Sequence, residues 1–517
     1  MSTYTGTASD YLDLLTRIDG HLRTTGHAWG QAFTGTGTGR LTSCTGTAAS
    51  VAETITVSFT SSTAFTVSGS VSGALGSGTV GTPFTSAKVG FTAVAGGTPF
   101  TAGDAFTLGT SPAWTRLRAE GCGGANKRTG TLLNIENLFD GSSTTATAAT
   151  GTGYVDFAML VPTEVREIIV QNASTSAQPT AFRLQYAPTA GGPWTTAQSW
   201  SGQTWTGSQE SKTLAIPAAG AHPFWRFEIT ASSTASIALN ALTLKAKAGD
   251  GYDVGEHAAM LWQAPGLDGA RQILIGARTY GSSSADTFNL GFSGLRVHSS
   301  ALAIDAQPNG STSRWVALVN APIAYWLVVS GQRFILVTRA AGTYQTAYCG
   351  LGLPYEPPSV HAYPLIIGAS SAGRTTRYSA QTGEYRHPMD PGDGLAAYYP
   401  DATWRNHINR VTSSGSSPDF NHSSAPGKVW PAALQIGTSH MPTNIREGID
   451  GSRVLLPGVL LHASSPTHAW GEFDGYLWAS GFGTSAEAIV TEGLYDHLIV
   501  PNIYRAQPQH YAAVRLD

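Results

Sequence analysis

The chain has 517 residues, a length that suggests two to four domains. Charged residues make up 12% of it, about half of the usual share, whereas glycine alone contributes 60 residues. The hydrophobic share of 41% excludes wholesale disorder, and the net charge of −3 gives no field that would gather nucleic acid. This composition favours a mainly β, multidomain protein whose weakly charged surfaces are covered by neighbouring subunits.

Three cysteines, Cys44, Cys122 and Cys349, lie far apart in the sequence and show no CxxC spacing. They indicate neither a disulfide framework nor a zinc site. The N-terminal residues lack the basic and apolar regions of a signal peptide, and no apolar run reaches the ~18 residues of a membrane-spanning helix. We therefore expect a protein that folds in a reducing cytoplasm and has no membrane-spanning segment.

The first predicted element is a short amphipathic helix within a lead segment, residues 1–45. Ser9 is its predicted N-cap, and Asp10 and Asp13 occupy the first turn, where acidic side chains are favourable. Its apolar residues recur at helical spacing: Tyr11, Leu14, Leu15, Ile18 and Leu22. Because a helix of about three to four turns is marginal alone, we expect this apolar stripe to dock on the C-terminal half of the chain or on a neighbouring subunit.

The pattern then changes to that of short strands. From Val51 to Leu108, apolar residues alternate with polar ones in runs separated by turns rich in Ser and Gly. This alternation is typical of half-buried antiparallel strands. It predicts a small antiparallel β-module at residues 46–112, followed by a connector at residues 113–127.

Residues 128–248 form the third predicted unit. They contain, in this order, the runs NIENLFDGSSTT, YVDFAMLVPTEVREIIVQNAS, FRLQYAP and WRFEITAS. The order resembles that of discoidin-type, galactose-binding-like domains, and the resemblance implies a β-sandwich of the jelly-roll type. The chain departs from the family pattern in two ways: Tyr154–Phe157 stand where a Trp-led segment is usual, and the pair of cysteines that ties the termini of many members is missing.

The same resemblance implies a loop that supports calcium at Asp140, in the run Phe139-Asp140-Gly141. A structural turn is the alternative reading, since backbone carbonyls would supply most of the calcium ligands. Beyond a possible structural calcium ion, we expect no cofactor.

Three tryptophans in this unit, Trp194, Trp200 and Trp205, lie among Gly, Ser and Thr residues. Flat aromatic faces stack on sugar rings, so these residues are the predicted ligand-binding residues for a glycan. Packing in a core or against another subunit is the alternative role.

Residues 249–517 form the largest predicted unit, which is rich in β structure. Two apolar runs, Ile323–Val329 and Arg333–Val337, flank a short Gly-containing connection and predict a hairpin covered on both faces. A long polar region rich in Pro and Gly follows, from Gly373 to Gly427. We expect residues 1–45 and 251–517 to form one discontinuous scaffold into which the two β-modules are inserted.

Two groups of residues could carry chemistry. His462, His468, Glu472 and Asp474 could form an acid–base set, but their aromatic–polar alternation favours an ordinary strand with structural pairing. His387, Asp390, Asp393 and Asp401 could offer oxygen ligands to a cation, but Asp before Pro or Gly favours structural turns. No nucleophile, zinc or phosphate-binding motif occurs, so we expect no catalytic activity.

The run from Ile323 to Ser370 carries a second resemblance, together with the opening run Thr7–Leu22, the run Gly471–Gly483 and the chain end Ile503–Asp517. These residues resemble virion proteins of tailed bacteriophages, which are tail-tip, baseplate or fibre-type components. The resemblance implies a structural virion protein that is folded in the host cytoplasm, forms a homo-oligomer or binds other tail proteins, and displays the jelly roll. A host-glycan-binding receptor-recognition protein is the alternative, and a glycan-degrading tail enzyme is the third reading.

Overall fold

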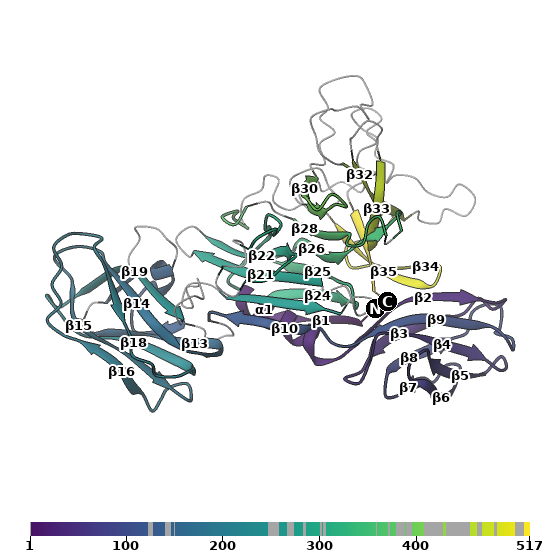
Figure 1. Ribbon diagram of the computed structural model, residues 1–517, viewed down its shortest axis with the longest axis horizontal. Helices are drawn as coiled ribbons and strands as arrows, with labels where there is room; N and C mark the ends of the chain where they lie inside the picture. Colours follow the sequence, from purple (N-terminus) through teal and green to yellow (C-terminus); the bar gives the residue numbers. More distant parts are fainter. Residues whose placement is uncertain are drawn as a thin grey trace, which may run out of the picture.

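The computed structural model shows four β-rich parts in one molecule (Figure 1). It describes residues 2–122, 128–139, 146–148, 150–246, 258–265, 273–282, 286–299, 302, 307–357, 359–370, 373–378, 388, 395–407, 428–430, 455–462, 468–479, 483–501 and 511–516. The expected mainly β, multidomain fold with one N-terminal helix is confirmed. No helix among these residues is long and apolar enough to span a membrane.

Two antiparallel sheets form the central scaffold sandwich. The first contains, in spatial order, β1 (Ser2–Ala8), β24 (Ile323–Val329), β25 (Arg333–Ala340), β26 (Thr343–Leu351), β28 (Leu365–Ala369), β29 (Leu395–Tyr398) and β30 (Trp404–His407). The second contains β10 (Thr115–Glu120), β20 (Ala259–Ala264), β21 (Ile273–Ser282), β22 (Thr287–Leu295) and β23 (Arg314–Leu318). The first sheet therefore joins the N-terminal strand β1 to strands from residues 323–407, and the second joins β10 to strands from residues 259–318.

The predicted hairpin is the centre of the scaffold. Strands β24 and β25 pair antiparallel, with Val329 opposite Phe334. Phe334 and Leu336 enter the core between the two scaffold sheets, whereas Ile335 and Val337 enter a second core on the opposite face. The hairpin is thus covered on both faces, as its unbroken apolar runs predicted.

Helix α1 (Tyr11–Thr24) seals one end of the scaffold core. Its N-cap is Asp10 rather than the predicted Ser9, because the Asp10 carboxylate accepts hydrogen bonds from the backbone N–H groups of Leu12 and Asp13 at 2.8 and 2.9 Å. Buried Asp19 on this helix accepts a hydrogen bond from the Trp262 indole at 2.9 Å. The helix therefore docks on the C-terminal half of its own chain, one of the two predicted positions.

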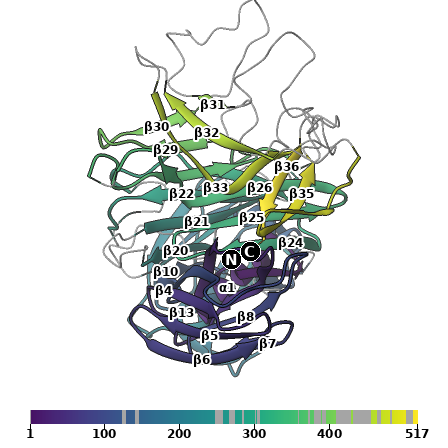
Figure 2. The same ribbon diagram turned by 90° about the vertical axis from the view of Figure 1, so that its right-hand side faces the viewer.

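The C-terminal sheet covers the second face of the hairpin. It contains β31 (Lys428–Trp430), β32 (Leu456–His462), β33 (His468–Ala479), β36 (Tyr511–Arg515), β35 (Tyr495–Pro501) and β34 (Ile489–Glu492), with β27 (Leu353–Pro354) paired to β33. The two chain ends lie side by side, since the Thr3 hydroxyl donates to the carbonyl of Leu516 (Figures 1 and 2).

The small β-module lies beneath the scaffold in Figure 2 and begins earlier than predicted. It contains β2 (His27–Thr34), β3 (Arg40–Gly46), β4 (Glu53–Phe59), β5 (Ala64–Gly69), β6 (Gly73–Thr79), β7 (Pro83–Thr85), β8 (Val89–Val94) and β9 (Ala105–Ser111). Strand β2 pairs with β9 and β3 pairs with β8, so the module starts at His27 rather than at residue 46. Phenylalanine rings fill its core, with Phe59 and Phe100 stacked at 3.8 Å.

The jelly roll occupies the opposite end of the molecule from the β-module (Figure 1). One sheet contains β11 (Arg128–Gly130), β13 (Gly153–Thr163), β18 (His222–Ser232), β15 (Pro179–Ala187) and β16 (Thr195–Trp200). The other contains β12 (Ala146–Ala148), β19 (Ile237–Ala246), β14 (Val165–Asn172) and β17 (Ser211–Ala215), and the short 3-10 helix η1 (Ile135–Phe139) precedes β12. The two sheets enclose a core of their own.

The jelly roll joins the scaffold through the segment that was predicted to be a connector. Residues 115–120 of this segment form strand β10, which pairs with β20 as an edge of the scaffold. The N–H of Leu160 in the jelly roll donates to the carbonyl of Gly121 at 2.9 Å, just after β10 ends. The jelly roll is therefore attached to a strand of the sandwich and not to a free linker.

Each of the three cysteines is buried in a different core. Cys44 lies in the β-module, Cys122 in the jelly roll and Cys349 in the scaffold sandwich. This separation keeps the thiols apart, in agreement with the absence of disulfide spacing in the sequence.

Candidate functional site

The outer face of the five-stranded jelly-roll sheet carries a compact group of aromatic and charged side chains. Strands β13 and β18 alternate regularly, with Val155, Phe157 and Phe227 buried in the core and the intervening residues half-buried on the outside. The outward residues that interact are Tyr154, Asp156, Arg183, Trp194, Arg226 and Glu228, which we call the aromatic–ionic face.

Arg226 is the centre of this face. Its guanidinium donates two hydrogen bonds to the Asp156 carboxylate, from Nε at 2.6 Å and from the second nitrogen at 2.8 Å. Cζ of Arg226 lies 3.9 Å from the centre of the Tyr154 ring and 4.3 Å from that of the Trp194 ring. The hydrogen bond to Asp156 raises the pKa of Arg226, and both rings add cation–π attraction.

Trp194 is held in place from two directions. It immediately precedes the edge strand β16, yet its ring lies over Arg226 on β18, so the indole reaches across the intervening strand β15. Gln185, on the outer face of β15, is accordingly only 5% exposed. On the other side, a Cβ added to Gly192, which has φ of +105°, would lie 2.9 Å from the Trp194 ring. Trp194 is therefore a fixed, half-buried aromatic platform.

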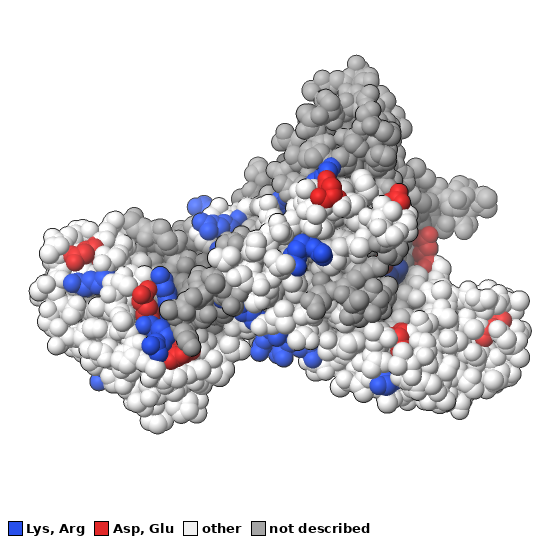
Figure 3. All heavy atoms as spheres, viewed as in Figure 1, with Lys and Arg blue, Asp and Glu red and all other residues white. Residues whose placement is uncertain are grey.

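A second ion pair extends the face. Nε of Arg183 donates to the Glu228 carboxylate at 2.6 Å. Glu228 is the next outward-facing residue after Arg226 on β18, and it lies opposite Arg183 on β15. The two ion pairs together carry no net charge. The face therefore offers hydrogen-bond donors and acceptors but has no excess of either sign of charge. Figure 3 shows basic and acidic side chains gathered side by side on this lobe, whose surface is otherwise mostly uncharged.

Of the three predicted tryptophans, only Trp194 belongs to this face. Trp200 is half-buried at the other end of β16, where its ring packs 5.4 Å from Phe182. Trp205 is 7% exposed, and its indole N–H donates to the carbonyl of Pro179 at 2.8 Å. Trp205 therefore has the alternative, core role, because its one polar atom is satisfied inside the sandwich. Asp140 lies outside the described residues.

Sequence reasoning did not single out Tyr154, Asp156 or Arg226. Tyr154 and Asp156 belong to the segment that departs from the Trp-led pattern of discoidin-type domains, and Arg226 lies 70 residues after Asp156 in the chain. The alternation of apolar and polar residues indicates which side chains of β13 and β18 point outward. It does not indicate the pairing register that places Arg226 opposite Asp156.

The two carboxylates of the candidate acid–base set have separate partners. Asp474 is buried and bonds Arg333 Nε at 3.0 Å and an Arg515 nitrogen at 2.5 Å, so it has the structural pairing that was predicted. Glu472 instead accepts a hydrogen bond from the Tyr355 hydroxyl at 3.0 Å. The backbones of His462 and His468 pair in the C-terminal sheet, and their side chains lie outside the described structure.

The candidate cation group is described only in part. Asp401 accepts hydrogen bonds from Thr403 and Arg405 in a structural turn, as predicted. His387, Asp390 and Asp393 lie outside the described residues. Among the residues that are described, no group of three His, Cys, Asp or Glu side chains is placed to hold a metal ion.

Comparisons with known proteins give likenesses to solved structures only. No protein-family model and no curated protein matches the sequence. Chitosan-binding module 1 of a chitosanase/glucanase from Paenibacillus sp. IK-5 is 20% identical, with a TM-score of 0.19, over 23% of this chain and 95% of that one. Truncated AlyQ with CBM32 and alginate lyase domains is 10% identical, with a TM-score of 0.21, over 44% and 81% of the two chains. Allantoicase from Saccharomyces cerevisiae is 9% identical, with a TM-score of 0.17, over 39% and 75%.

Proposed function

We propose that this chain is a non-catalytic structural protein of a bacteriophage tail that displays a glycan-binding jelly roll. The observation that carries the glycan-binding part is the aromatic–ionic face. A sugar ring has an apolar C–H side, which suits the fixed indole of Trp194, and hydroxyl groups, which suit paired carboxylates and guanidiniums. The Asp156 and Glu228 carboxylate oxygens can accept hydrogen bonds from sugar hydroxyls, and the Arg183 guanidinium can donate hydrogen bonds to the hydroxyl oxygens.

The charge balance of the face selects the kind of sugar. Two acids and two arginines are already paired, so a charged ligand would have to break a charge-assisted hydrogen bond to gain another one. A neutral sugar needs no such exchange. We therefore expect neutral hexoses as ligands, with weak single-site affinity that becomes useful through many copies on one particle.

A glycan array probed with the full-length chain tests this part of the proposal, followed by titration calorimetry with each glycan that binds. Trp194→Ala should weaken binding by about tenfold, the loss expected for one stacking contact. Tyr355→Ala is the matched control, because Tyr355 is an exposed aromatic residue on the scaffold, 52% accessible. Unchanged affinity in a folded Trp194→Ala protein would refute the assignment of the face.

The tail role is supported by the resemblance of the runs Ile323–Ser370, Gly471–Gly483 and Ile503–Asp517 to virion proteins of tailed bacteriophages. The low charge of the chain also suits surfaces covered by neighbours in a particle. Mass spectrometry of purified virions, together with sedimentation of the recombinant protein, tests this role. Absence from virions combined with a compact monomer in solution would refute it.

A further inference from the structure

The aromatic–ionic face extends across four strands of the jelly-roll sheet. Strand register places Tyr154 on β13 opposite Glu228 on β18. Glu228 also lies opposite Arg183 on β15, and Arg183 lies opposite Ser199 on β16. We call these four residues the open row. Neighbouring strands lie about 4.8 Å apart, so the row is about 14 Å long, which is longer than one sugar ring. Each of its positions carries a hydroxyl, carboxylate or guanidinium group that can bond a sugar hydroxyl.

The open row is more accessible than the row of residues next to it. In that neighbouring row, Arg226 lies opposite Gln185, which is covered by the Trp194 indole and is 5% exposed. The Arg226 side chain is 18% exposed. In the open row, by contrast, the Arg183 side chain is 39% exposed and Ser199 is exposed as well. A glycan that continues beyond Trp194 therefore reaches the polar groups of the open row before those of its neighbour.

Two aromatic rings share the guanidinium of Arg226 as a common neighbour. Its Cζ lies 3.9 Å from the Tyr154 ring centre and 4.3 Å from the Trp194 ring centre, so the two ring centres are at most 8.2 Å apart. Both rings are half-buried and are held on the same face of the sheet by this contact. Two rings fixed close together suit two consecutive sugar units, one on each ring, whereas a single sugar can use only one of them.

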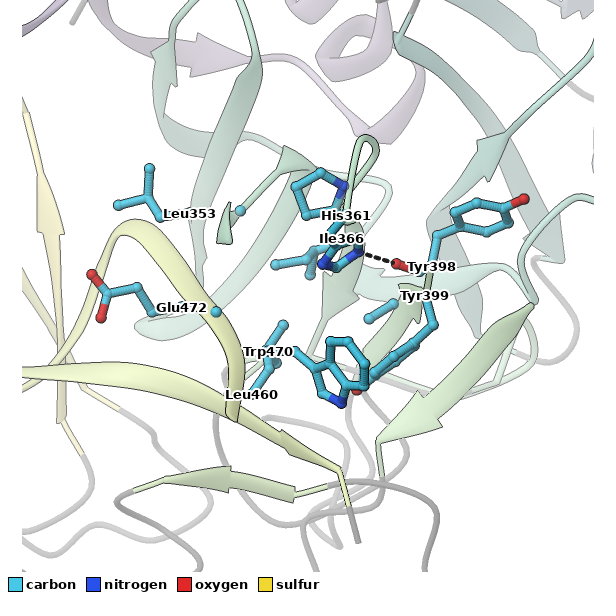
Figure 4. Close-up of a pocket in the computed structure, with 12 residues that line it drawn as sticks. Leu353, His361, Ile366, Tyr398, Tyr399, Leu460, Trp470 and Glu472 are labelled. Carbon is cyan, nitrogen blue, oxygen red and sulfur yellow. Dashed lines mark hydrogen bonds between the residues drawn. The ribbon is translucent and has the colours of Figure 1, made fainter. Parts of the chain in front are cut away.

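The pocket at the seam between the scaffold sandwich and the C-terminal sheet is a poorer place for a glycan (Figure 4). His361, Tyr399 and Trp470 line it, and their ring centres lie 5.4 to 6.4 Å apart. These are the distances of aromatic rings that pack on one another, so little space is left between them. Figure 4 shows that the Glu472 carboxylate points away from His361. The polar groups of this pocket therefore do not converge on one ligand, and we place the glycan on the jelly roll.

We propose that the aromatic–ionic face binds several consecutive units of a linear neutral glycan, not a single terminal sugar. One unit stacks on Trp194, the next contacts Tyr154, and their hydroxyl groups bond along the open row. There Glu228 accepts hydrogen bonds from hydroxyls, and Arg183 donates to them. This inference rests on the proposed glycan-binding function and adds the length of the ligand to it.

The test measures how affinity depends on ligand length. The full-length chain is titrated with linear oligosaccharides of glucose, of galactose and of mannose, each from one to six units, and weak binding is followed by saturation-transfer NMR. In a series that binds, we expect affinity to rise about a hundredfold from the single sugar to the longest glycan, because Tyr154 and the open row each add about tenfold. A site for one unit gains at most about sixfold, from the larger number of equivalent units. A rise of sixfold or less overturns the ligand length and leaves the proposed function intact, whereas no binding in any series overturns both.

Glu228→Gln tests the open row separately from the Trp194 platform. The ion pair that it removes is partly exposed and contributes little to stability, so the variant stays folded, which a melting curve checks. We expect the longest glycan of the binding series to bind about tenfold more weakly and the single sugar to bind as before. Glu167→Gln, which changes an acid on β14 in the other sheet of the jelly roll, should alter neither affinity. An equal loss for both ligands, or a loss for neither, overturns the role of the open row.

Discussion

Replacement of Asp474 by Asn tests how the C-terminal sheet is locked to the scaffold. Asp474 lies on β33 and neutralises Arg333 on β25 and Arg515 on β36. Arg333 is fully buried and the side chain of Arg515 is 16% exposed, so the two guanidiniums share one carboxylate in a mostly dry site. Burial acts to raise the pKa of Asp474, but the charges of Arg333 and Arg515 outweigh it and lower the pKa.

The expected loss of stability follows from this geometry. Asn keeps the shape of the side chain but removes its charge, which leaves two buried or half-buried guanidiniums facing one another. Breaking a buried ion pair on one side costs roughly 3–5 kcal/mol. For a unit the size of the scaffold, about 2–4 °C is lost per kcal/mol, so we expect the melting temperature of the scaffold to fall by roughly 6–20 °C.

Differential scanning calorimetry of the full-length protein at pH 7 measures this change, because each cooperative unit gives a resolved or fitted transition. Glu167→Gln is the matched control, since Glu167 pairs with Lys245 at 3.4 Å on the surface and such pairs contribute about 0–1 kcal/mol. The depressed pKa of Asp474 contributes stability at pH values above its unfolded value of 3.8, and this contribution is lost as the pH falls through the lower folded value. If Asp474→Asn melts within a degree or two of Glu167→Gln, the lock does not exist.

Three more predictions follow from single side chains. Trp205→Ala should destabilise the jelly roll by about 3–5 kcal/mol in urea unfolding, because it empties a core position, whereas mutation of half-buried Trp194 should cost clearly less. Burial lowers the pKa of His27 from 6.5 to about 4, so stability should fall as the pH drops from 6.5 to 4, by roughly 3 kcal/mol for this group, and His27→Gln should flatten that part of the curve. Gly192→Ala should weaken glycan binding several-fold at a stability cost of about 1–3 kcal/mol, because its Cβ would displace the Trp194 ring and strain a positive φ; calorimetry that finds full affinity would show that the ring is not fixed by this contact.

The periodicity of apolar residues along short segments predicted the hairpin and the N-terminal helix. The unbroken apolar runs of the hairpin predicted strands covered on both faces, and β24 spans the same residues, Ile323–Val329, as the predicted strand. The spacing of apolar residues predicted helix α1 and its buried stripe. In both cases burial of a periodic set of side chains decides the structure, and such periodicity is readable in one sequence.

Non-local pairing explains what the sequence alone did not reveal. His27–Thr34 pairs with Ala105–Ser111, so the β-module includes a strand that lies before its predicted start at residue 46. Thr115–Glu120 pairs with Ala259–Ala264, so the predicted connector contains a strand of the scaffold. The same applies to the aromatic–ionic face. Its central contact joins Arg226 to Asp156 through strand register, while the composition around Trp205 gave no sign that this indole enters the core.

The central claim is that a glycan contacts the jelly roll at Trp194. The chain has 13 tryptophans, and each indole N–H of the ¹⁵N-labelled protein gives its own NMR signal. The Trp194 signal is identified by its loss in Trp194→Phe, and the protein is then titrated with a glycan that binds on the array. We predict that the Trp194 signal shifts with the saturation curve of binding while the signal of buried Trp205 stays in place. A saturating glycan that moves other indole signals and leaves that of Trp194 unchanged would contradict the account.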